Sequence, residues 1–478
     1  MNNDKDIEII DFLTNITPLT LVDRKINYKL NMQRSETVNK TIQKAKRYFS
    51  ENQLIKKIWR IDKPINGIDF DIPVYICNRE IIRKSNSYEK PKPIKAISNF
   101  SNCHSFGKGQ TEEQAFASCI CEGLERSWAA SWEGRNIWCR SYNDVKEYAI
   151  LPSDIDNLSE DDFRRYKKYY SDSSIAPNPW YHPKFFRFHE DLKIDWTWGF
   201  SLSSESAVLA PAISSLIHFS PTNDAFFCNQ MNTNGLSLGN NLEEAILQGF
   251  FEVIERDSVM IFMRAPVVLP DVDLESFPND FIRATVKKCR SANIELIVKD
   301  FTTDLGIPVF CAQIFNNTGY PKYIYGLGSH LDSEIALTRA ISEVFQGFFS
   351  HLHMSELFND EMSDIGLTQP HHTGLNKNED NFCKTFKDYS IKKSDNLKED
   401  IGTCLKMVNK HSMDIVVIPI KSDEDFSVVK VLVPGSATCD QRRPPIFLSD
   451  RVYTVPKNMG YIDRNLTLDD LYLEWIFI

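Results

Sequence analysis

Apolar residues recur along this chain at two spacings, one typical of helices and the other typical of strands. Apolar or alternating runs predict strands at residues 57–62, 72–77, 96–100, 196–201, 207–212, 224–227, 295–299, 309–315, 415–419 and 428–433. Apolar positions three and four apart predict helices at 35–49, from Thr111 onward, at 242–263 and 280–291, from 330 to about 353, and at 401–410. Because strands and helices interleave throughout, the predicted fold class is α+β, with mixed sheets packed with helices.

Polar and proline-containing stretches separate these elements. A turn is expected at 64–67 and loops are expected at 85–93 and 266–278. The strongly polar stretch 359–399 is predicted to be a long loop or insertion. Residues 140–195 give no clear pattern.

One pattern occurs twice and returns a third time in a looser form, which indicates internally repeated β-α units. The two close copies share the spacing G-x5-A-x6-E-x2-E-R, and the third keeps A-x6-E-x2-Q. The copies are Gly109, Ala115, Glu122, Glu125 and Arg126; then Gly239, Ala245, Glu252, Glu255 and Arg256; then Ala336, Glu343 and Gln346.

The acidic residues of each copy form a stripe at the edge of an apolar face. On the second helix, Glu244, Gln248, Glu252 and Glu255 fall within roughly 80° of one another at 3.6 residues per turn. Helices of this kind brought together would cluster carboxylates in one cavity. Since clustered carboxylates repel unless cations hold them, the pattern favours a Mg²⁺-nucleotide site.

A structural explanation of the same residues remains open. A single E-x2-E-R on a helix is usually a solvated face with pairing between neighbouring turns. The repeat could therefore reflect duplication of a unit whose glutamates only cap or pair. Gly107-Lys108-Gly109 could present Lys108 to phosphate, but on its own this pattern favours a tight turn.

Histidines could in principle add metal ligands. The candidates are His351 with His353, and His371 with His372. No cysteine or carboxylate lies at a convincing spacing from either pair, so ordinary surface histidines are the favoured interpretation.

Composition limits the partners and the compartment. The 478 residues are 42% hydrophobic and 25% charged, which suffices for a sizeable core, and the net charge of −10 argues against nucleic acid as a main partner. Eleven scattered cysteines without a C-x-x-C pair indicate reduced thiols. The acidic start is unlike a secretory signal, and the apolar window 207–219 is too short to span a bilayer. A cytoplasmic protein without a membrane partner is expected.

Together these motifs resemble those of the YcaO family. The first motif is Gly107-Lys108-Gly109 with Ser118-x3-Glu122-x2-Glu125-Arg126, and the second runs from Asn234-Gly235 through Gly239-Asn-Asn241 and Glu244 to Arg256-Asp257. Arg339-x3-Glu343-x2-Gln346 is similar to the third, and 428–435 resembles the late strand and turn. The match runs in order over roughly residues 55–440.

The resemblance implies an enzyme that uses ATP and Mg²⁺ to phosphorylate the oxygen of a peptide backbone amide during maturation of a ribosomal peptide. It implies a nucleotide site made of Lys108, Ser118, Glu122, Glu125, Arg126, Asn241, Glu244, Glu252, Glu255, Arg256, Arg339 and Glu343. Among these, Glu122, Glu125, Glu252 and Glu255 would hold Mg²⁺. It also implies an N-terminal extension over 1–55, a catalytic domain over 56–440 with an insertion at about 359–400, and a tail over 441–478.

The expected product is a thiazoline or oxazoline formed by cyclodehydration of Cys, Ser or Thr. Many azoline-forming members end in a proline-rich tail, but here no proline follows Pro456 and the chain ends in Glu474-Trp-Ile-Phe-Ile478. Thioamide formation with a separate partner protein is therefore an alternative. A precursor peptide and a separate leader-recognition or accessory protein are the expected partners, and a homodimer is compatible with the family. A non-catalytic scaffold is the alternative of another class.

Overall fold

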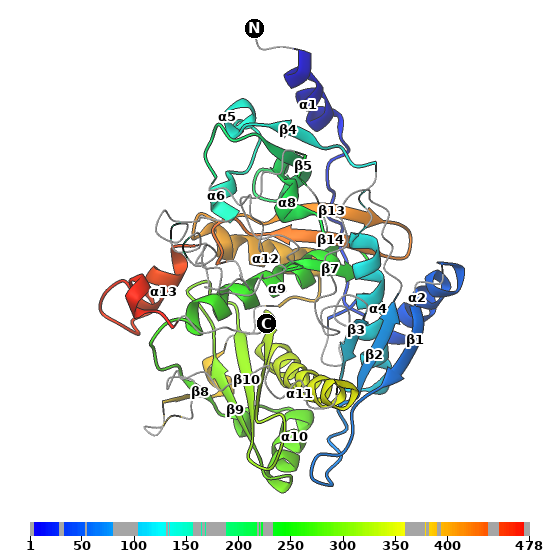
Figure 1. The fold of residues 1–478 in the computed structure, drawn as a ribbon, viewed down its shortest axis with the longest axis vertical. Coiled ribbons are helices and arrows are strands. Elements are labelled where there is room, and N and C mark those ends of the chain that lie inside the picture. Colours follow the sequence, from blue (N-terminus) through cyan, green and yellow to red (C-terminus); the bar gives the residue numbers. More distant parts are fainter. Residues whose placement is uncertain are drawn as a thin grey trace.

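The computed structural model describes most of the chain and shows mixed sheets packed with helices (Figure 1). The α+β class predicted from the sequence is confirmed. The described residues are 4–27, 33–52, 55–79, 104–130, 132, 134–155, 164, 168, 188–217, 219, 221–222, 233–358, 378, 382–389, 393–437 and 449–472.

Three sheets form the framework of the described chain. A three-stranded antiparallel sheet has the order β1 (Ile55–Arg60), β2 (Val74–Arg79), β3 (His104–Lys108). A second sheet has the order β4 (Trp138–Arg140), β5 (Ile194–Ser201), β13 (Val416–Ser422), β14 (Ser427–Leu432), β7 (Leu236–Gly239), with β6 (Ser206–Pro211) also paired to β5. The third has the order β11 (Tyr323–Ser329), β10 (Val309–Asn316), β9 (Ile294–Asp300), β8 (Asp271–Val272), β12 (Cys383–Lys384).

Helices cover these sheets and connect them. The long helices are α4 (Glu112–Ala129), α9 (Leu242–Phe262) and α11 (Ser333–Phe358). The others include α1 (Asp4–Asn15), α2 (Val38–Asn52), α10 (Asp280–Ser291), α12 (Leu397–Asn409) and α13 (Arg451–Asn458), with shorter turns at Tyr142–Val145, Pro152–Ile155 and Ala212–Ser215. In Figure 1, α9 crosses the middle of the molecule between the second sheet and the third.

The helix α9 is the centre of the largest apolar core. Its side chains Phe250 and Ile254 are fully buried and pack in one cluster with Val431 of β14 and Leu327 of β11. Complete burial of such side chains contributes roughly 1.5–3 kcal/mol each. The apolar face of α9 thus joins two sheets, and the glutamates at the edge of that face are held beside the core.

The sequence repeat corresponds to three β-α units, namely β3 with α4, β7 with α9 and β11 with α11. The glycine of the first two copies explains part of the repeated spacing. A Cβ on Gly109 would lie 2.6 Å from the backbone nitrogen of Ala115, and a Cβ on Gly239 would lie 2.4 Å from that of Ala245. The strand therefore enters its helix so closely that only glycine fits.

Most long elements follow the predictions. The helix at 280–291 has the predicted bounds, the helix at 242–263 differs from α9 by one residue, and the Thr111 side chain caps α4 by accepting from the Gln114 N–H. The predicted helix at 35–49 is displaced to Val38–Asn52. The predicted strands at 96–100 and 224–227 and the loop at 85–93 lie outside the described residues.

Several elements were missed or placed wrongly. No pattern predicted α1 or the short strand β7, and the predicted loops 266–278 and 359–399 contain β8 and β12, respectively. The helix α12 begins at Leu397, not at 401, because Asn396 caps it by accepting from the Lys398 N–H. Short strands have too few residues to show a period, and for this reason pattern analysis misses them.

The close approach at the second unit yields a stability prediction. Gly239→Ala should lower the free energy of unfolding by about 1–3 kcal/mol, because overpacking forces backbone shifts. Gly402→Ala in α12 is the matched control, since nothing lies within 4 Å of its Cβ position and alanine is the better helix former. Denaturant unfolding of both variants measures the difference, and an unchanged midpoint for Gly239→Ala would contradict the assignment.

Candidate functional site

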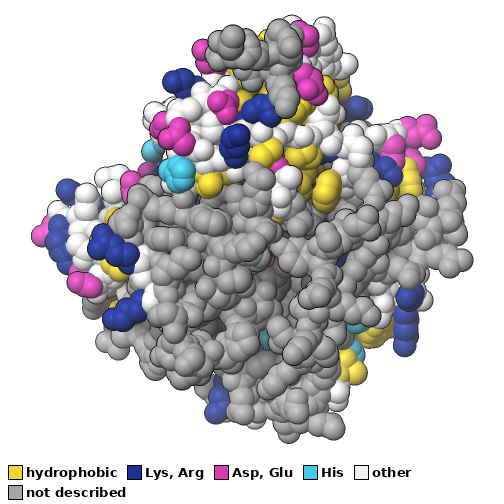
Figure 2. All heavy atoms as spheres, turned by 45° about the horizontal axis from the view of Figure 1, so that its top comes forward, with side chains coloured by type: hydrophobic (Ala, Val, Ile, Leu, Met, Phe, Trp, Pro, Cys, Tyr) yellow, Lys and Arg dark blue, Asp and Glu magenta, His cyan; other side chains and the backbone are white. Residues whose placement is uncertain are grey.

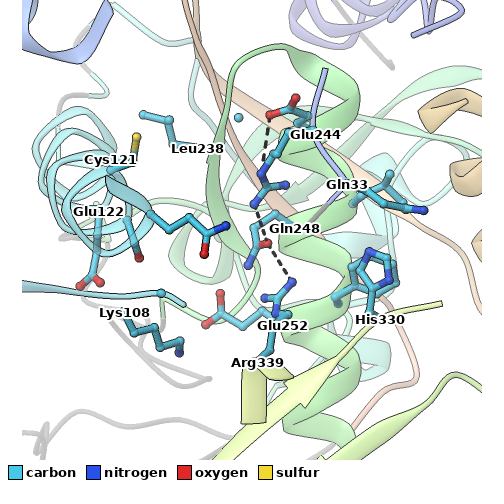
Figure 3. Close-up of a pocket in the computed structure, with 18 of the residues that line it drawn as sticks. Gln33, Lys108, Cys121, Glu122, Leu238, Glu244, Gln248, Glu252, His330 and Arg339 are labelled. Carbon is cyan, nitrogen blue, oxygen red and sulfur yellow. Dashed lines mark hydrogen bonds and ion pairs between the residues drawn. The ribbon is translucent and has the colours of Figure 1, made fainter. Parts of the chain in front are cut away.

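A cavity of about 500 Å³ lies where the three β-α units meet. The helices α4, α9 and α11 each contribute polar side chains to its wall (Figure 3). In Figure 3, Glu122 and Lys108 lie on one side of the space, Glu252 and Arg339 lie below it, and Glu244 lies above. The carboxylate clustering expected from the repeated stripes is therefore present.

Almost all site residues implied by the resemblance line this one cavity. They are Lys108, Ser118, Glu122, Glu125, Arg126, Glu244, Glu252, Glu255, Arg256, Arg339 and Glu343. Asn241 does not line it. Its side chain caps α9 by accepting from the Glu244 N–H at 3.0 Å and donates to the Ser35 hydroxyl at 2.6 Å, while the adjacent Asn240 faces the cavity.

Two of the glutamates are fixed by the backbone of the next unit. Glu125 of α4 accepts a hydrogen bond of 3.1 Å from the Leu238 N–H of β7, and Glu255 of α9 accepts one of 3.0 Å from the Ser329 N–H of β11. A backbone donor in a strand cannot rotate away, so each carboxylate is held at a defined position. Each of these two helices therefore reaches the strand of the following unit.

The third unit completes this arrangement with a different contact. Glu343 of α11 pairs with Lys108 at the end of β3, which belongs to the first unit. Gln346 stands where the other helices carry Glu125 and Glu255, and it also lines the cavity. The three units are thus connected in a closed ring. The second acidic position of the motif is a glutamate in the first two units and a glutamine in the third.

Burial disfavours the charged form of these carboxylates and so raises their pKa values. Burial, reinforced by nearby acids such as Glu122, raises the pKa of Glu125 to about 8 against the positive influence of Arg126. Burial and the neighbouring Glu343 raise the pKa of Glu255 to about 7. At neutral pH these two groups therefore hold protons for part of the time unless further positive charge enters the cavity.

The pKa values of the other carboxylates depend on burial and on the charges beside each of them. Burial raises the pKa of Glu122 and of Glu252, and nearby arginines oppose that effect only in part. Burial also acts on Glu343, but the charges of Lys108 and Arg256 outweigh it and lower its pKa. The charged form of Glu343 is therefore favoured relative to an ordinary glutamate, whereas burial disfavours the charged forms of Glu122 and Glu252.

Arg126 and Arg339 bring guanidinium groups to the cavity wall. Arg126 lies 3.6 Å from Glu125 and 4.0 Å from Glu122, and its buried Nε has no hydrogen-bond partner in the described part of the chain. Arg339 donates to the Gln248 side-chain oxygen at 3.1 Å. Guanidinium groups of this kind suit phosphate oxygens, which accept two parallel hydrogen bonds.

The residues present fit a nucleotide with Mg²⁺ better than they fit a metal alone. No group of three or more His, Cys, Asp or Glu side chains in the described ranges is arranged as a metal site. Mg²⁺ commonly takes only one or two carboxylates and completes its shell with water and phosphate oxygens. Raised pKa values beside an arginine with an unsatisfied buried donor are consistent with that division of ligands, and the assignment of Glu122, Glu125, Glu252 and Glu255 to Mg²⁺ stays a prediction.

Two interpretations favoured from the pattern alone are revised. The tight turn at Gly107-Lys108-Gly109 is wrong, because Gly107 and Lys108 are the last two residues of β3 and Lys108 points into the cavity. The solvated face expected of an isolated E-x2-E-R is corrected in part: the stripes line a cavity, but Arg126 also lies 4.0 Å from Glu122 one turn away, as that interpretation expected.

The histidine pairs show no metal site within the described ranges. His351 contacts the Tyr320 hydroxyl at 3.3 Å and His353 lies beside the Trp59 ring. His371 and His372 lie outside the described residues.

Some cavity residues were not found from the sequence. His330 lies six positions before Ala336, where the first two copies carry glycine, and its ring packs 4.8 Å from that of Phe251. Its Nδ1 accepts the Asp332 N–H at 3.0 Å, and burial lowers its pKa well below the usual value, so the ring is neutral with its proton on Nε2. Aligning the third copy to its first position would have shown this substitution.

The N-terminal segment also contributes to the wall. Gln33 and Arg34 line the same cavity, although they precede the first motif by more than seventy residues. No repeat or motif marks them, and only the folded chain brings them to the site.

The family model described as YcaO cyclodehydratase, ATP- and Mg²⁺-binding, matches residues 106–437. The chain belongs to the YcaO family. The family model gives ATP and Mg²⁺ as the cofactors, as the resemblance predicted, and the chain is an ATP-dependent enzyme. The repeated units and their acidic stripes form most of the cavity wall in this YcaO chain.

Curated relatives of this YcaO chain are distant. An uncharacterized protein of Methanothermobacter thermautotrophicus is 28% identical over 351 residues, which are 69% of this chain and 80% of that protein. The ribosomal protein S12 methylthiotransferase accessory factor YcaO of Escherichia coli is 23% identical over 51% of this chain and 42% of its own length.

Solved structures of similar proteins agree with the fold. A heterocyclase in complex with substrate and cofactor has a TM-score of 0.82 and 26% identity, and the match covers 99% of this chain and 60% of that one. The heterocyclase TruD has a TM-score of 0.66 and 27% identity over 77% of this chain and 51% of its own. YcaO from Methanopyrus kandleri, bound with AMPPCP and Mg²⁺, shares the fold with a TM-score of 0.58 at 19% identity over 87% of this chain and 95% of its own. The chain thus spans little more than half of the two heterocyclases.

The raised carboxylate pKa values predict a pH dependence of stability. A folded-state pKa of about 8 for Glu125 and about 7 for Glu255, against 4.5 for an ordinary glutamate, favours the protonated folded protein. The resulting stabilisation is fully present below about pH 4.5 and is lost as the pH rises toward 8. The nucleotide-free protein should therefore melt at a lower temperature at pH 8 than at pH 6, and Mg²⁺ with AMPPCP should reduce that loss.

Two variants test the source of this slope. Glu125→Gln should reduce the fall in melting temperature between pH 6 and pH 8. Glu113→Gln should not, because Glu113 is exposed on the same helix and lies outside the cavity. Thermal unfolding between pH 6 and pH 8 is the measurement. Equal slopes for both variants would show that the cavity carboxylate does not titrate as described.

Proposed function

We propose that this enzyme uses ATP and Mg²⁺ to activate a backbone amide of a ribosomal precursor peptide, and that the product is a thiazoline or oxazoline ring. The observation that supports it best is the single cavity in which carboxylates and guanidinium groups from all three repeated units converge. The likeness to a heterocyclase in complex with substrate and cofactor, over 99% of this chain, supports the ring-forming outcome.

The proposed chemistry explains why phosphate transfer is needed. A Cys, Ser or Thr side chain of the peptide adds to the carbonyl carbon of the preceding amide, and the oxygen so formed must then leave. ATP supplies the phosphoryl group that makes this oxygen a leaving group, and its departure with loss of the amide proton leaves a C=N bond. The net change in the peptide is loss of one water.

The enzyme's own residues would act by positioning and by balancing charge. Glu122, Glu125, Glu252 and Glu255 are proposed to hold Mg²⁺. Lys108, Ser118, Arg126, Glu244, Arg256, Arg339 and Glu343 are proposed to hold the nucleotide, and Asn241 to act indirectly by capping α9. Positioning and electrostatic stabilisation are the main means by which proteins catalyse phosphoryl transfer.

Thioamide formation is the second candidate function. The same cavity supports it, because a phosphorylated amide oxygen would leave in both reactions. External sulfide would then replace the amide oxygen, with a separate protein assisting. A non-catalytic scaffold is disfavoured, because glutamates of all three copies face the cavity.

Several further features of the proposal concern partners and compartment. A separate leader-recognition or accessory protein, a homodimer and a cytoplasmic location are part of it. No helix in the described part of the chain is both long and apolar enough to cross a membrane. On the face shown in Figure 2, the described acidic and basic side chains are interspersed.

The proposed charge balance yields a first prediction. Glu255→Gln should lower ATP turnover by about 10²–10³-fold, because it removes a negative ligand while the amide oxygen can still accept from the Ser329 N–H. Glu399→Gln on the exposed side of α12 is the control and should keep full turnover. Phosphate release in the presence of peptide is the measurement, with circular dichroism to show that both variants fold. Normal turnover by Glu255→Gln would remove this residue from the site.

The product can be identified by mass. A candidate precursor peptide incubated with enzyme, ATP and Mg²⁺ should lose about 18 Da per modified residue if a ring forms, and should gain about 16 Da if sulfur replaces oxygen. Omitting ATP is the control. ATP consumption with no change in any peptide, with and without accessory protein, would refute both proposed products.

A further inference from the structure

Arg135, which lies between α4 and β4, fills a gap in the second sheet. The strands β5 and β13 pair as far as Phe200 and Val417. Pro419 comes two residues later on β13, and because proline has no backbone N–H it cannot continue the ladder as a donor. The Arg135 guanidinium group donates instead to the carbonyl oxygens of Trp198 and Pro419. Arg135 therefore joins the two strands where their own hydrogen bonds end.

The charge of this guanidinium group is not balanced by an acid within the described residues. Its acceptors are the two carbonyl oxygens and the Thr197 hydroxyl, all of them neutral, and its remaining N–H groups have no acceptor in the described part of the chain. Its other contact is the Trp198 ring, whose centroid lies 4.3 Å away. By contrast, the buried Arg451 pairs with Asp257 at 2.8 Å. Burial alone acts on the Arg135 group and lowers its pKa to about 10. A cation in this situation is stabilised by a carboxylate that approaches from solvent.

The surface beside Arg135 is apolar. Ile137, Trp198 and Ile420 pack against one buried cluster, and each of them is only half-buried. The strands β4 and β5 lie toward the top of Figure 1, and apolar side chains are exposed beside charged ones at that end of the molecule (Figure 2). A carboxylate next to an apolar side chain is the ligand that complements such a surface.

The helix α4 limits the distance between Arg135 and the nucleotide cavity. Glu125 lines the cavity, α4 ends at Ala129, and Arg135 is six residues further along the chain. At 1.5 Å per helical residue and 3.6 Å per extended residue, the Cα atoms of Glu125 and Arg135 are at most about 28 Å apart. An extended peptide of about nine residues covers that distance.

We propose that Arg135 is a docking site for a carboxylate of the peptide substrate, at up to about nine residues from the amide that is modified. The carboxylate accepts from the remaining N–H groups of Arg135, and a neighbouring apolar side chain of the peptide packs against Trp198. Because Arg135 does not line the nucleotide cavity, it acts on peptide binding and not on phosphoryl transfer. This inference rests on the proposed function, to which it adds a preference for acidic peptides.

Steady-state kinetics with two peptides tests the inference. The first is a precursor peptide that shows one of the mass changes described above, and the second is the same peptide with each Asp and Glu replaced by Asn and Gln. Arg135→Gln should raise KM for the acidic peptide by about 10- to 100-fold, as expected for a charge-assisted hydrogen bond, and should leave kcat and KM for ATP unchanged. The amide peptide should have a raised KM with the wild type and no further rise with Arg135→Gln.

Arg464→Gln is the matched control. It removes the same charge, but Arg464 is exposed and already pairs with Asp470 at 2.6 Å, so KM for both peptides should equal that of the wild type. Circular dichroism shows whether Arg135→Gln folds, since Arg135 also joins two strands. If that variant does not fold, hydrogen exchange of the wild-type protein takes its place. The acidic peptide should then protect residues 135–140 and 197–201, and the amide peptide should not.

Three results would overturn the inference. They are equal KM values for the two peptides, a loss in kcat without a rise in KM for Arg135→Gln, and equal protection of β4 and β5 by both peptides. If the wild-type protein modifies no peptide in the presence of ATP, the proposed function itself fails, so the two failures can be told apart.

Discussion

The cavity depends on hydrogen bonds between helices and strands. Acidic side chains on α4 and α9 accept these bonds from backbone N–H groups of the neighbouring strand. Glu125 and Glu255 make this contact at Leu238 and Ser329, and the Glu343 pair with Lys108 closes the ring. Each bond holds a carboxylate where burial disfavours its charge. The same bonds join units that are far apart in sequence. The contacts that fix the positions of the acids therefore also hold the repeated units together.

The ring is not symmetric, and its asymmetry bears on how a ligand would be oriented. Two units present two acids each, while the third presents Glu343 with Gln346 and takes its positive charge from Lys108 and Arg339. The cavity residues of α4 and α9 therefore carry more acids than arginines, whereas on α11 Arg339 balances Glu343. A ligand with both a metal ion and phosphate groups has the complementary polarity.

Local pattern was enough to predict the parts of this molecule that are long and regular. The stripes on α4, α9 and α11 were visible because the helical period repeats over many turns, and their convergence followed from the repeat. The short strand β7 was missed, although it carries the Leu238 donor.

Long-range contacts explain why Asn241 was assigned wrongly to the cavity wall and why Arg34 and Gln33 were missed. Asn241 was assigned to the nucleotide from its place in a motif, but a cap position turns its side chain toward the helix end and toward Ser35. Arg34 and Gln33 reach the cavity only because Glu243 and Glu244 accept from the N-terminal segment, and contacts over two hundred residues apart leave no local signal in one sequence. Pattern therefore predicted the framework, while long-range hydrogen bonds decided the rest of the wall.

The use of peptide N–H groups as anchors has a consequence for sequence variation. At positions 238 and 329 the donor belongs to the main chain, so the acids would keep their places whatever side chain stood there, provided that the strand still formed. Proline alone among the amino acids would delete the anchor without altering the acid. The residue type at positions 238 and 329 can therefore vary while the hydrogen bond to the glutamate is kept. A comparison of side chains among sequences would not reveal the importance of these two positions.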